Sequence, residues 1–281
     1  MGKPLRIAYA GHDFFSSCMA TLVSRPDTEV AVCLTEGPEG QPARNVLRLA
    51  SAANARVFTG RPTVDVVREV NAANVDLFVC AAYMYRVPTQ YLDVPYAVNV
   101  HPALLPDGRG PNPLPYLATA FTQFSGVTIH EMTAELDKGP ILVQSPVDQS
   151  PEDGLDELYL KLFALAPRLL SRLMDDLEGY FAAKRHVQGG SYWPHKDGDV
   201  LIASQHTTEH ALRLHSSFGM YGFSVKLEGR TEFRASLLSA TRCDHDFVVG
   251  SVVAELQVGT IVALPDGLVR LDTQRSLPVV T

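Results

Sequence analysis

The chain has 281 residues, of which 46% are hydrophobic, and a formal net charge of −7. Mean hydropathy is +0.03. Gly, Pro or charged residues break every apolar run before it reaches the ~18 residues that a membrane span needs. We therefore expect a soluble protein of one or two domains without a membrane partner. The negative charge argues against nucleic acid as a partner, because phosphate backbones require clustered Lys and Arg.

The first third of the chain alternates strand-like and helical stretches. Such alternation predicts an α/β fold with a mostly parallel, doubly wound sheet that is covered on both faces. Ligand sites in these sheets lie beyond the carboxyl ends of the strands. We expect strands at residues 5–10, 29–35, 56–59 and 75–81, and helices at residues 14–24, 43–55 and 63–73.

Two further strand-like runs, 97–101 and 126–132, precede the most informative polar residues. Asn99 and His101 are two positions apart, so in a strand both side chains point to one face. Asp137 comes just after the second run. An amide that can polarise a carbonyl, an imidazole that titrates near neutral pH and a carboxylate that orients it form a proton-transfer site. The alternative is that the three side chains only cap turns.

The second half begins with leucines at helical spacing from Leu155 to Leu173, which predict a helix packed on the sheet. Gly189-Gly190 then marks a boundary, and Tyr192-Trp193 could fold over a substrate or fix the junction. We expect one domain over 1–188 and a small β-rich, barrel-like accessory domain over 189–281, which offers an interface for a homodimer. Its predicted elements are a helix at 208–217 and strands near 223–227, 233–239, 259–264 and 269–272.

Other motifs mainly exclude functions. The four cysteines form no C-x-x-C pair, which favours reduced thiols and a cytoplasmic location, and the first residues lack the layout of a secretory signal. His206 and His210 have the spacing of a helical zinc pair, but Thr207 stands where the metalloprotease motif has Glu, so we expect solvated histidines and no metal. The absence of G-x-G-x-x-G and Walker patterns argues against a nucleotide-dependent dehydrogenase.

Four short motifs follow one another in a fixed order: N-x-H-P-x-L-L-P at 99–106, R-G at 109–110, G-V-T-I-H at 126–130 and L-D-x-G-x-I-L at 136–142. This ordered set resembles the folate-dependent formyltransferases, which include the glycinamide ribonucleotide, methionyl-tRNA, sugar and siderophore enzymes. The resemblance implies a Rossmann-like catalytic domain and N10-formyltetrahydrofolate as formyl donor. It also implies that Asn99 donates to the developing oxyanion, that His101 stabilises that charge or relays the proton, and that Asp137 orients His101 or a water.

The resemblance also implies positions for donor and acceptor. The segment after the fourth strand is similar to the one that accepts the folate pterin ring, and residues 132–137 would form the opposite wall; flat rings are held by apolar walls and backbone amides. Two of the positions near the acceptor have other possible roles: Asp13 could only cap a helix, and Arg109 could pair with Asp107 and not reach an anion. The folate contacts implied are Tyr83, Met84, Arg86, Val87, Met132, Glu135 and Leu136, and the acceptor contacts are Gly11, His12, Asp13, Phe14 and Arg109.

Three departures from the family narrow the choice of acceptor. The tRNA-modifying members carry a long basic insertion after the second strand, where this chain has the short acidic segment 35–41. Glycinamide ribonucleotide enzymes are shorter and lack a C-terminal barrel, and formyl-folate hydrolases carry a regulatory domain before the first strand. We expect a small biosynthetic amine, such as an amino sugar nucleotide or a hydroxyornithine-type precursor. The alternatives are a methionyl-tRNA formyltransferase, a formyl-folate hydrolase and a catalytically silent folate-binding module.

Overall fold

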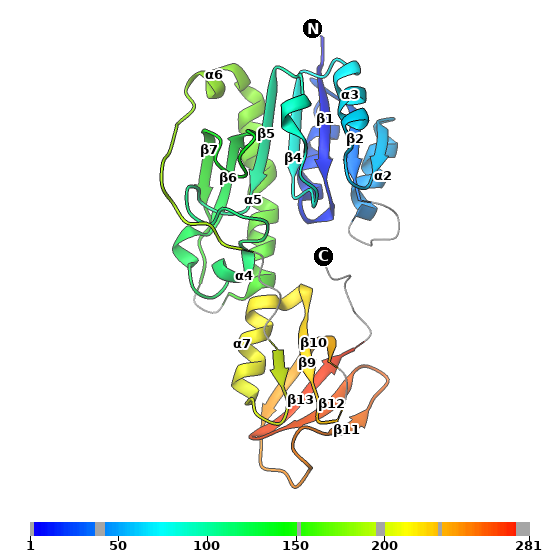
Figure 1. The fold of residues 1–281 in the computed structure, drawn as a ribbon, viewed down its shortest axis with the longest axis vertical. Coiled ribbons are helices and arrows are strands. Elements are labelled where there is room, and N and C mark those ends of the chain that lie inside the picture. Colours follow the sequence, from blue (N-terminus) through cyan, green and yellow to red (C-terminus); the bar gives the residue numbers. More distant parts are fainter. Residues whose placement is uncertain (1–2, 37–42, 151–152, 195–199, 230–231, 274–281) are drawn as a thin grey trace. The chain divides into compact units, whose positions relative to one another are not determined.

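The computed structural model describes residues 3–36, 43–150, 153–194, 200–229 and 232–273. It forms two compact units, each made of three chain segments (Figure 1). The predicted domains 1–188 and 189–281 stay a prediction. The first unit comprises Met1–Pro113, Gln123–Asp148 and Leu160–Pro194, and the second comprises Leu114–Thr122, Gln149–Tyr159 and His195–Thr281.

A seven-stranded sheet forms the centre of the first unit. Its strands are β1 (Leu5–Gly11), β2 (Thr28–Thr35), β3 (Arg56–Thr59), β4 (Leu77–Ala81), β5 (Tyr96–His101), β6 (Gly126–Glu131) and β7 (Ile141–Pro146). The order is β3-β2-β1-β4-β5-β6-β7. The first five strands run parallel, and β6 and β7 are antiparallel additions next to β5. The predicted α/β fold with a mostly parallel sheet is therefore confirmed.

Both faces of this sheet are covered, as the continuous apolar strands predict. Ala8 and Ala10 of β1 share one core cluster with Val70 of α3. Tyr9 points to the opposite face, where its hydroxyl donates to the Phe15 carbonyl at 3.0 Å. The helices of this part of the chain are η1 (Asp13–Phe15), α1 (Ser16–Ser24), α2 (Arg44–Ala52), α3 (Val64–Ala72), η3 (Thr89–Tyr91), η4 (Thr122–Phe124), α5 (Leu155–Asp175) and α6 (Leu177–Ala182).

The long helix α5 contains a proline that α1 compensates. Pro167 lacks an N–H, so it cannot bond the carbonyl four residues earlier in the helix. That carbonyl belongs to Phe163, and it accepts a hydrogen bond from the Ser17 hydroxyl of α1 at 2.9 Å. A side chain of one helix thus supplies the bond that the backbone of the other cannot make.

The second unit has its own six-stranded sheet and core. Its elements are α4 (Leu114–Leu117), β8 (Val200–Ile202), α7 (Thr208–Phe218), η5 (Gly219–Tyr221), β9 (Phe223–Lys226), β10 (Phe233–Arg242), β11 (Val252–Glu255), β12 (Thr260–Leu264) and β13 (Gly267–Asp272). The strand order is β11-β12-β13-β10-β9-β8, antiparallel except for the pair β8–β9. Leu214 and Phe218 of α7 pack into the same core as Phe223 and Val225 of β9. All four predicted strands are present, and β8 and β11 are additional.

The structure also places the cysteines and the histidine pair that the sequence analysis considers. All four cysteines are free, and Cys18, Cys33 and Cys80 are buried. The rings of His206 and His210 lie 3.9 Å apart, and His206 accepts a backbone hydrogen bond through Nδ1. Within the described ranges, no group of three or more His, Cys, Asp or Glu side chains could hold a metal ion, and no helix has the length and apolarity of a membrane span.

Candidate active site

Strands β5 and β6 bring four polar side chains to one face of the sheet. Asn99 pairs directly with His130, and His101 pairs with Thr128, in the antiparallel register of the two strands. Residues directly opposite each other in such a pair project to the same face, and the alternation along each strand places the two pairs side by side. The predicted common face of Asn99 and His101 is thus shared by a second imidazole.

The loop between β6 and β7 delivers the carboxylate. Asp137 lies in this loop in a left-handed conformation, with φ of 53°, and is buried. Two residues later, Gly139 passes so close to the Glu131 carbonyl that a Cβ at this position would collide with it. Because the loop folds back this tightly, it carries the Asp137 side chain over the face that bears Asn99 and His101.

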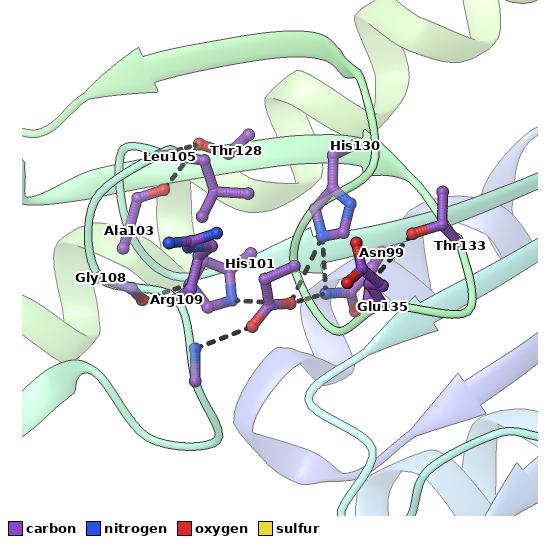
Figure 2. Close-up of polar contacts among 12 residues, drawn as sticks. Asn99, His101, Ala103, Leu105, Gly108, Arg109, Thr128, His130, Thr133 and Glu135 are labelled. Atoms are coloured by element: carbon purple, nitrogen blue, oxygen red, sulfur yellow. Dashed lines mark hydrogen bonds and ion pairs between the residues drawn. The ribbon is translucent and has the colours of Figure 1, made fainter. Parts of the chain in front are cut away.

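The Asp137 carboxylate is the centre of the site, and the three side chains that face it, Asn99, His101 and His130, are labelled in Figure 2. Its Oδ1 lies 3.3 Å from Asn99 Nδ2, 3.5 Å from His130 Nε2 and 3.6 Å from His101 Nδ1. Its Oδ2 accepts a hydrogen bond from the Gly110 N–H at 2.9 Å. The amide, imidazole and acid that the sequence singles out therefore meet in one place.

The backbone partners of the two imidazoles define their tautomers. His101 Nε2 lies 2.8 Å from the Gly108 carbonyl, and His130 Nδ1 lies 2.9 Å from the Glu131 carbonyl. Since a carbonyl only accepts, each of these nitrogens carries the hydrogen. His101 Nδ1 and His130 Nε2 are then the bare nitrogens of the neutral rings, and both face Asp137. A proton that arrives at either nitrogen is stabilised by the adjacent negative charge.

The environment sets the charge of each group. Burial lowers the pKa of His101, and the nearby Asp137 charge and the Gly108 carbonyl oppose that effect. Burial alone would raise the pKa of Asp137, but the adjacent His101 and His130 rings and the hydrogen bond from the Gly110 N–H prevail and lower it to about 2. Near neutral pH, the site therefore contains a carboxylate beside a neutral His101 that can accept a proton.

The NH2 group of the Asn99 side chain is engaged on both sides. Its Nδ2 makes hydrogen bonds with His130 Nε2 at 3.1 Å and with Asp137 Oδ1 at 3.3 Å. The opposite amide orientation would place two oxygens together, so the carboxylate fixes which way the amide points. Protonation of His130 at Nε2 would turn this acceptor into a donor and release one Asn99 N–H.

The loop after His101 is anchored to the neighbouring strands. The Thr128 hydroxyl donates to the Ala103 carbonyl at 2.6 Å and accepts the Leu105 N–H at 3.1 Å. The Gln144 amide of β7 donates to the Leu105 carbonyl at 3.0 Å. These bonds hold the proline-flanked loop that leads from His101 to Gly108 and Gly110.

The two loops predicted to contact folate are joined to each other. Arg86, after β4, donates through Nη2 to the Ala134 carbonyl in the β6–β7 loop. Tyr83 donates to the Gly60 carbonyl at 2.7 Å, and Val87 and Met132 belong to the core beneath.

Other predicted folate contacts are available to a ligand. Met84 and Leu136 expose 40% and 51% of their surface, and Glu135 pairs with Lys138 at 2.8 Å. Exposed apolar side chains on two linked loops, beside a cluster of amide and imidazole groups, fit a flat heterocycle that carries a reactive carbonyl.

The residues predicted to contact the acceptor have internal partners. Gly11 ends β1 against the Ala81 carbonyl, and His12 accepts the Phe14 N–H through Nδ1 at 2.8 Å. Asp13 does not cap the helix that follows it; its carboxylate accepts N–H groups at the start of α2, including that of Val46 at 3.0 Å. Their contact with an acceptor stays a prediction.

Arg109 likewise bonds within the chain. Its Nη2 donates to the Gly190 carbonyl at 3.0 Å, while Asp107 accepts hydrogen bonds from Ser191. Asp107 therefore bonds Ser191 in this structure, and the contact of Arg109 with an anionic acceptor stays a prediction.

Sequence reasoning missed His130 and the backbone groups of Gly108 and Gly110. His130 ends the G-V-T-I-H motif two residues after Thr128, so strand alternation places it on the same face as Thr128. Recognising it required the pairing of β5 with β6, which a single strand does not reveal. The glycines act through their backbone and leave no side-chain signal.

Comparison with known proteins identifies the family of this chain. Residues 20–174 match the formyl transferase family model, and the chain belongs to this family. A methionyl-tRNA formyltransferase of Alcanivorax borkumensis is 32% identical over 208 residues, which cover 69% of this chain and 62% of the relative.

Two solved structures share the fold. HypX from Aquifex aeolicus in complex with tetrahydrofolic acid superposes with a TM-score of 0.66 at 17% identity, and the match covers 95% of this chain but only 43% of the HypX chain. This chain therefore matches less than half the length of HypX. A 4-N formyltransferase from Francisella tularensis gives a TM-score of 0.62 at 17% identity and covers 84% of this chain and 98% of that chain.

Proposed function

We propose that the protein is an N-formyltransferase that moves the formyl group of N10-formyltetrahydrofolate to the amine of a small molecule. The observation that carries the proposal is the convergence of Asn99, His101 and His130 on the Asp137 carboxylate. Formyl transfer requires a donor to the carbonyl oxygen as it becomes negative and a group that takes a proton from the amine. Both are present within this cluster.

Asn99 is the proposed donor to the developing oxyanion. In this structure its N–H groups bond His130 Nε2 and Asp137 Oδ1. When His130 takes up a proton at Nε2, it stops accepting from Asn99, and the released amide N–H can turn to the carbonyl oxygen. The same protonation makes His130 a second donor, so negative charge on oxygen is stabilised only as it develops.

The proton follows a short route within the same cluster. The attacking amine forms a bond to the formyl carbon, the bond between that carbon and folate N10 breaks, and the proton lost by the amine returns to N10. His101 Nδ1 and His130 Nε2 are the bare nitrogens that can hold it, and Asp137 compensates the resulting positive charge. Asp137 thereby orients both rings, as the sequence leads us to expect for His101.

The donor would lie between the loops after β4 and β6. Met84 and Leu136 would contact the flat ring, and the bond from Arg86 to Ala134 would keep the loops together. Formyltetrahydrofolate supplies the activated formyl group, whose carbon the acceptor amine attacks. Tetrahydrofolic acid in the HypX structure supports this assignment by analogy of fold.

A small amine is the favoured acceptor, and methionyl-tRNA is the second candidate. The sequence relative from Alcanivorax borkumensis supports the tRNA reading. Against it, residues 200–281 contain seven Lys or Arg and eight Asp or Glu, so this part of the chain lacks the excess positive charge that phosphate binding requires. Within the short acidic segment 35–41, where tRNA enzymes have their basic insertion, residues 37–41 lie outside the described residues.

The test replaces Asn99 with alanine and measures tetrahydrofolate formation from the formyl donor with a panel of nucleotide-linked amino sugars and hydroxyornithine-type amines. Losing one oxyanion donor costs about 2.7–4 kcal/mol, so we expect Asn99→Ala to lose roughly 10²–10³-fold in kcat while its thermal unfolding stays close to wild type. Asn71→Ala is the matched control, because the Asn71 amide also makes two hydrogen bonds, with Tyr91 and Asp93, outside the site.

Each outcome has a meaning. Turnover that depends on an amine supports the transferase, and turnover without one would replace it with a hydrolase. Folate binding without any turnover would leave a silent binding module. Near-normal rates in the Asn99 variant would remove Asn99 from the mechanism.

A further inference from the structure

After α6 the chain runs back beside the loop that supports the catalytic groups. We name residues 189–193 the return segment and residues 107–110 the support loop. The Arg109 N–H donates to the Ser191 carbonyl at 3.1 Å, and the Trp193 N–H donates to the Arg109 carbonyl at 2.7 Å. Arg109 and Tyr192 therefore form a parallel β-bridge.

The bridge determines where the next backbone groups of the support loop point. Gly108 and Gly110, on either side of Arg109, have positive φ angles of 72° and 127° that glycine adopts without strain, so the backbone turns at both positions. Arg109 uses one edge to bond the return segment. The Gly108 carbonyl and the Gly110 N–H lie on the other edge, where they bond His101 Nε2 and Asp137 Oδ2. One stretch of backbone thus connects the return segment to both catalytic side chains.

Ser191 makes the side-chain contacts of this connection. Its hydroxyl donates to Asp107 Oδ1 at 2.9 Å and accepts the Gly108 N–H at 3.1 Å. Its own N–H donates to the same Asp107 oxygen at 3.1 Å. Gly108 is therefore held from both sides, since its N–H bonds Ser191 while its carbonyl bonds His101.

The two segments approach more closely than ordinary side chains allow. A Cβ at Gly190 would collide with the Pro106 carbonyl, and a Cβ at Gly110 would collide with the Trp193 carbonyl. A Cβ at Gly108 would lie 2.7 Å from the buried Trp193 ring. Such contacts leave the support loop little freedom while the return segment is in place.

We propose that Ser191, with Asp107, is a positioning residue that holds the support loop so that Gly108 and Gly110 fix His101 and Asp137. This inference rests on the proposed function for its effect on turnover, but its effect on His101 is independent of it. The Ser191 side chain does not touch the reacting groups; it acts through the backbone of the support loop.

The first experiment records the imidazole nitrogen resonances of His101 in histidine-labelled, ligand-free protein. In wild type we expect one tautomer, with the hydrogen on Nε2 and slow exchange of that hydrogen with water. Ser191→Ala should release the Gly108 carbonyl, which brings in the second tautomer and rapid exchange. Ser191→Thr keeps the hydroxyl and should restore the wild-type spectrum, and Ser24→Ala, at an exposed serine of α1, is the control.

The second experiment measures kinetics with the amine that the panel identifies. Because a misplacement of about 1 Å can cost up to ~10²-fold, we expect Ser191→Ala to lower kcat about 10-fold or more with little change in KM for the formyl donor, and Ser191→Thr to recover. A wild-type His101 spectrum in folded Ser191→Ala protein would overturn the inference even if stability falls. If that variant does not fold, Asp107→Ala removes the hydrogen bonds that Ser191 donates to Asp107 and is judged by the same spectrum.

Discussion

At the scale of single residues, the site depends on which imidazole nitrogens lack a proton. Backbone carbonyls occupy Nε2 of His101 and Nδ1 of His130, so the bare nitrogen of each ring faces Asp137. A carboxylate flanked by two bare nitrogens attracts a proton. A single proton transfer can therefore change the role of His130 and Asn99 together.

His12 provides a pH-dependent prediction away from this cluster. Burial lowers its pKa to about 4, while the unfolded ring titrates near 6.5. The unfolded state thus binds more protons between these values, so the stability that neutral His12 contributes is complete above pH 6.5 and is lost as pH falls toward 4.

The variant His12→Asn keeps an acceptor for the Phe14 N–H, since Asn is a good helix cap, and removes the titration. Between pH 6.5 and 4, we expect the unfolding free energy of this variant to fall by about 2 kcal/mol less than that of wild type. Urea denaturation at each pH measures the difference. Parallel pH profiles of the two proteins would show that His12 does not titrate in this way.

Residue-level prediction from the sequence worked where one strand was enough. The two-residue spacing of Asn99 and His101 predicts a shared face, which the structure confirms. Predicting that His130 belongs to the site requires the register between β5 and β6. Predicting the tautomers of the two rings requires the positions of the Gly108 and Glu131 carbonyls. These depend on pairing across the sheet, which local patterns do not contain.

At the scale of elements, α1 and α5 are coupled through one hydrogen bond. Ser17→Ala would leave the Phe163 carbonyl without the bond that Pro167 prevents the helix from making. We expect a loss of about 1–3 kcal/mol in the free energy of unfolding, measured with urea.

A double-mutant cycle tests the cause of that loss. In the Pro167→Ala background, the new backbone N–H can bond the Phe163 carbonyl, so Ser17→Ala should cost clearly less. Equal costs in both backgrounds would mean that the serine acts through another contact.

Hydrophobic periodicity predicts the longer helices and strands correctly. The buried runs of β1, β2 and β4 and the leucines of α5 appear close to their predicted positions. The short strands β8 and β11 were not predicted, because three or four residues carry too little alternation to distinguish a strand from a loop.

At the scale of the whole molecule, charge separates the two candidate acceptors. The net charge is −7, and the second unit carries no excess of positive residues. In an electrophoretic binding assay at physiological salt, we expect no retarded tRNA band with up to about 10 μM protein. That concentration lies within the usual range of dissociation constants for nonspecific binding. A nanomolar complex whose affinity falls steeply with salt would favour methionyl-tRNA instead.

The close packing of the support loop has an evolutionary consequence. Gly108, Gly110 and Gly190 have room for a hydrogen only, so any larger residue there would push apart the backbone behind the reaction centre. Selection for a different acceptor has little to vary at these three sites. It would have to work through other side chains, such as those of the predicted acceptor contacts His12 and Asp13.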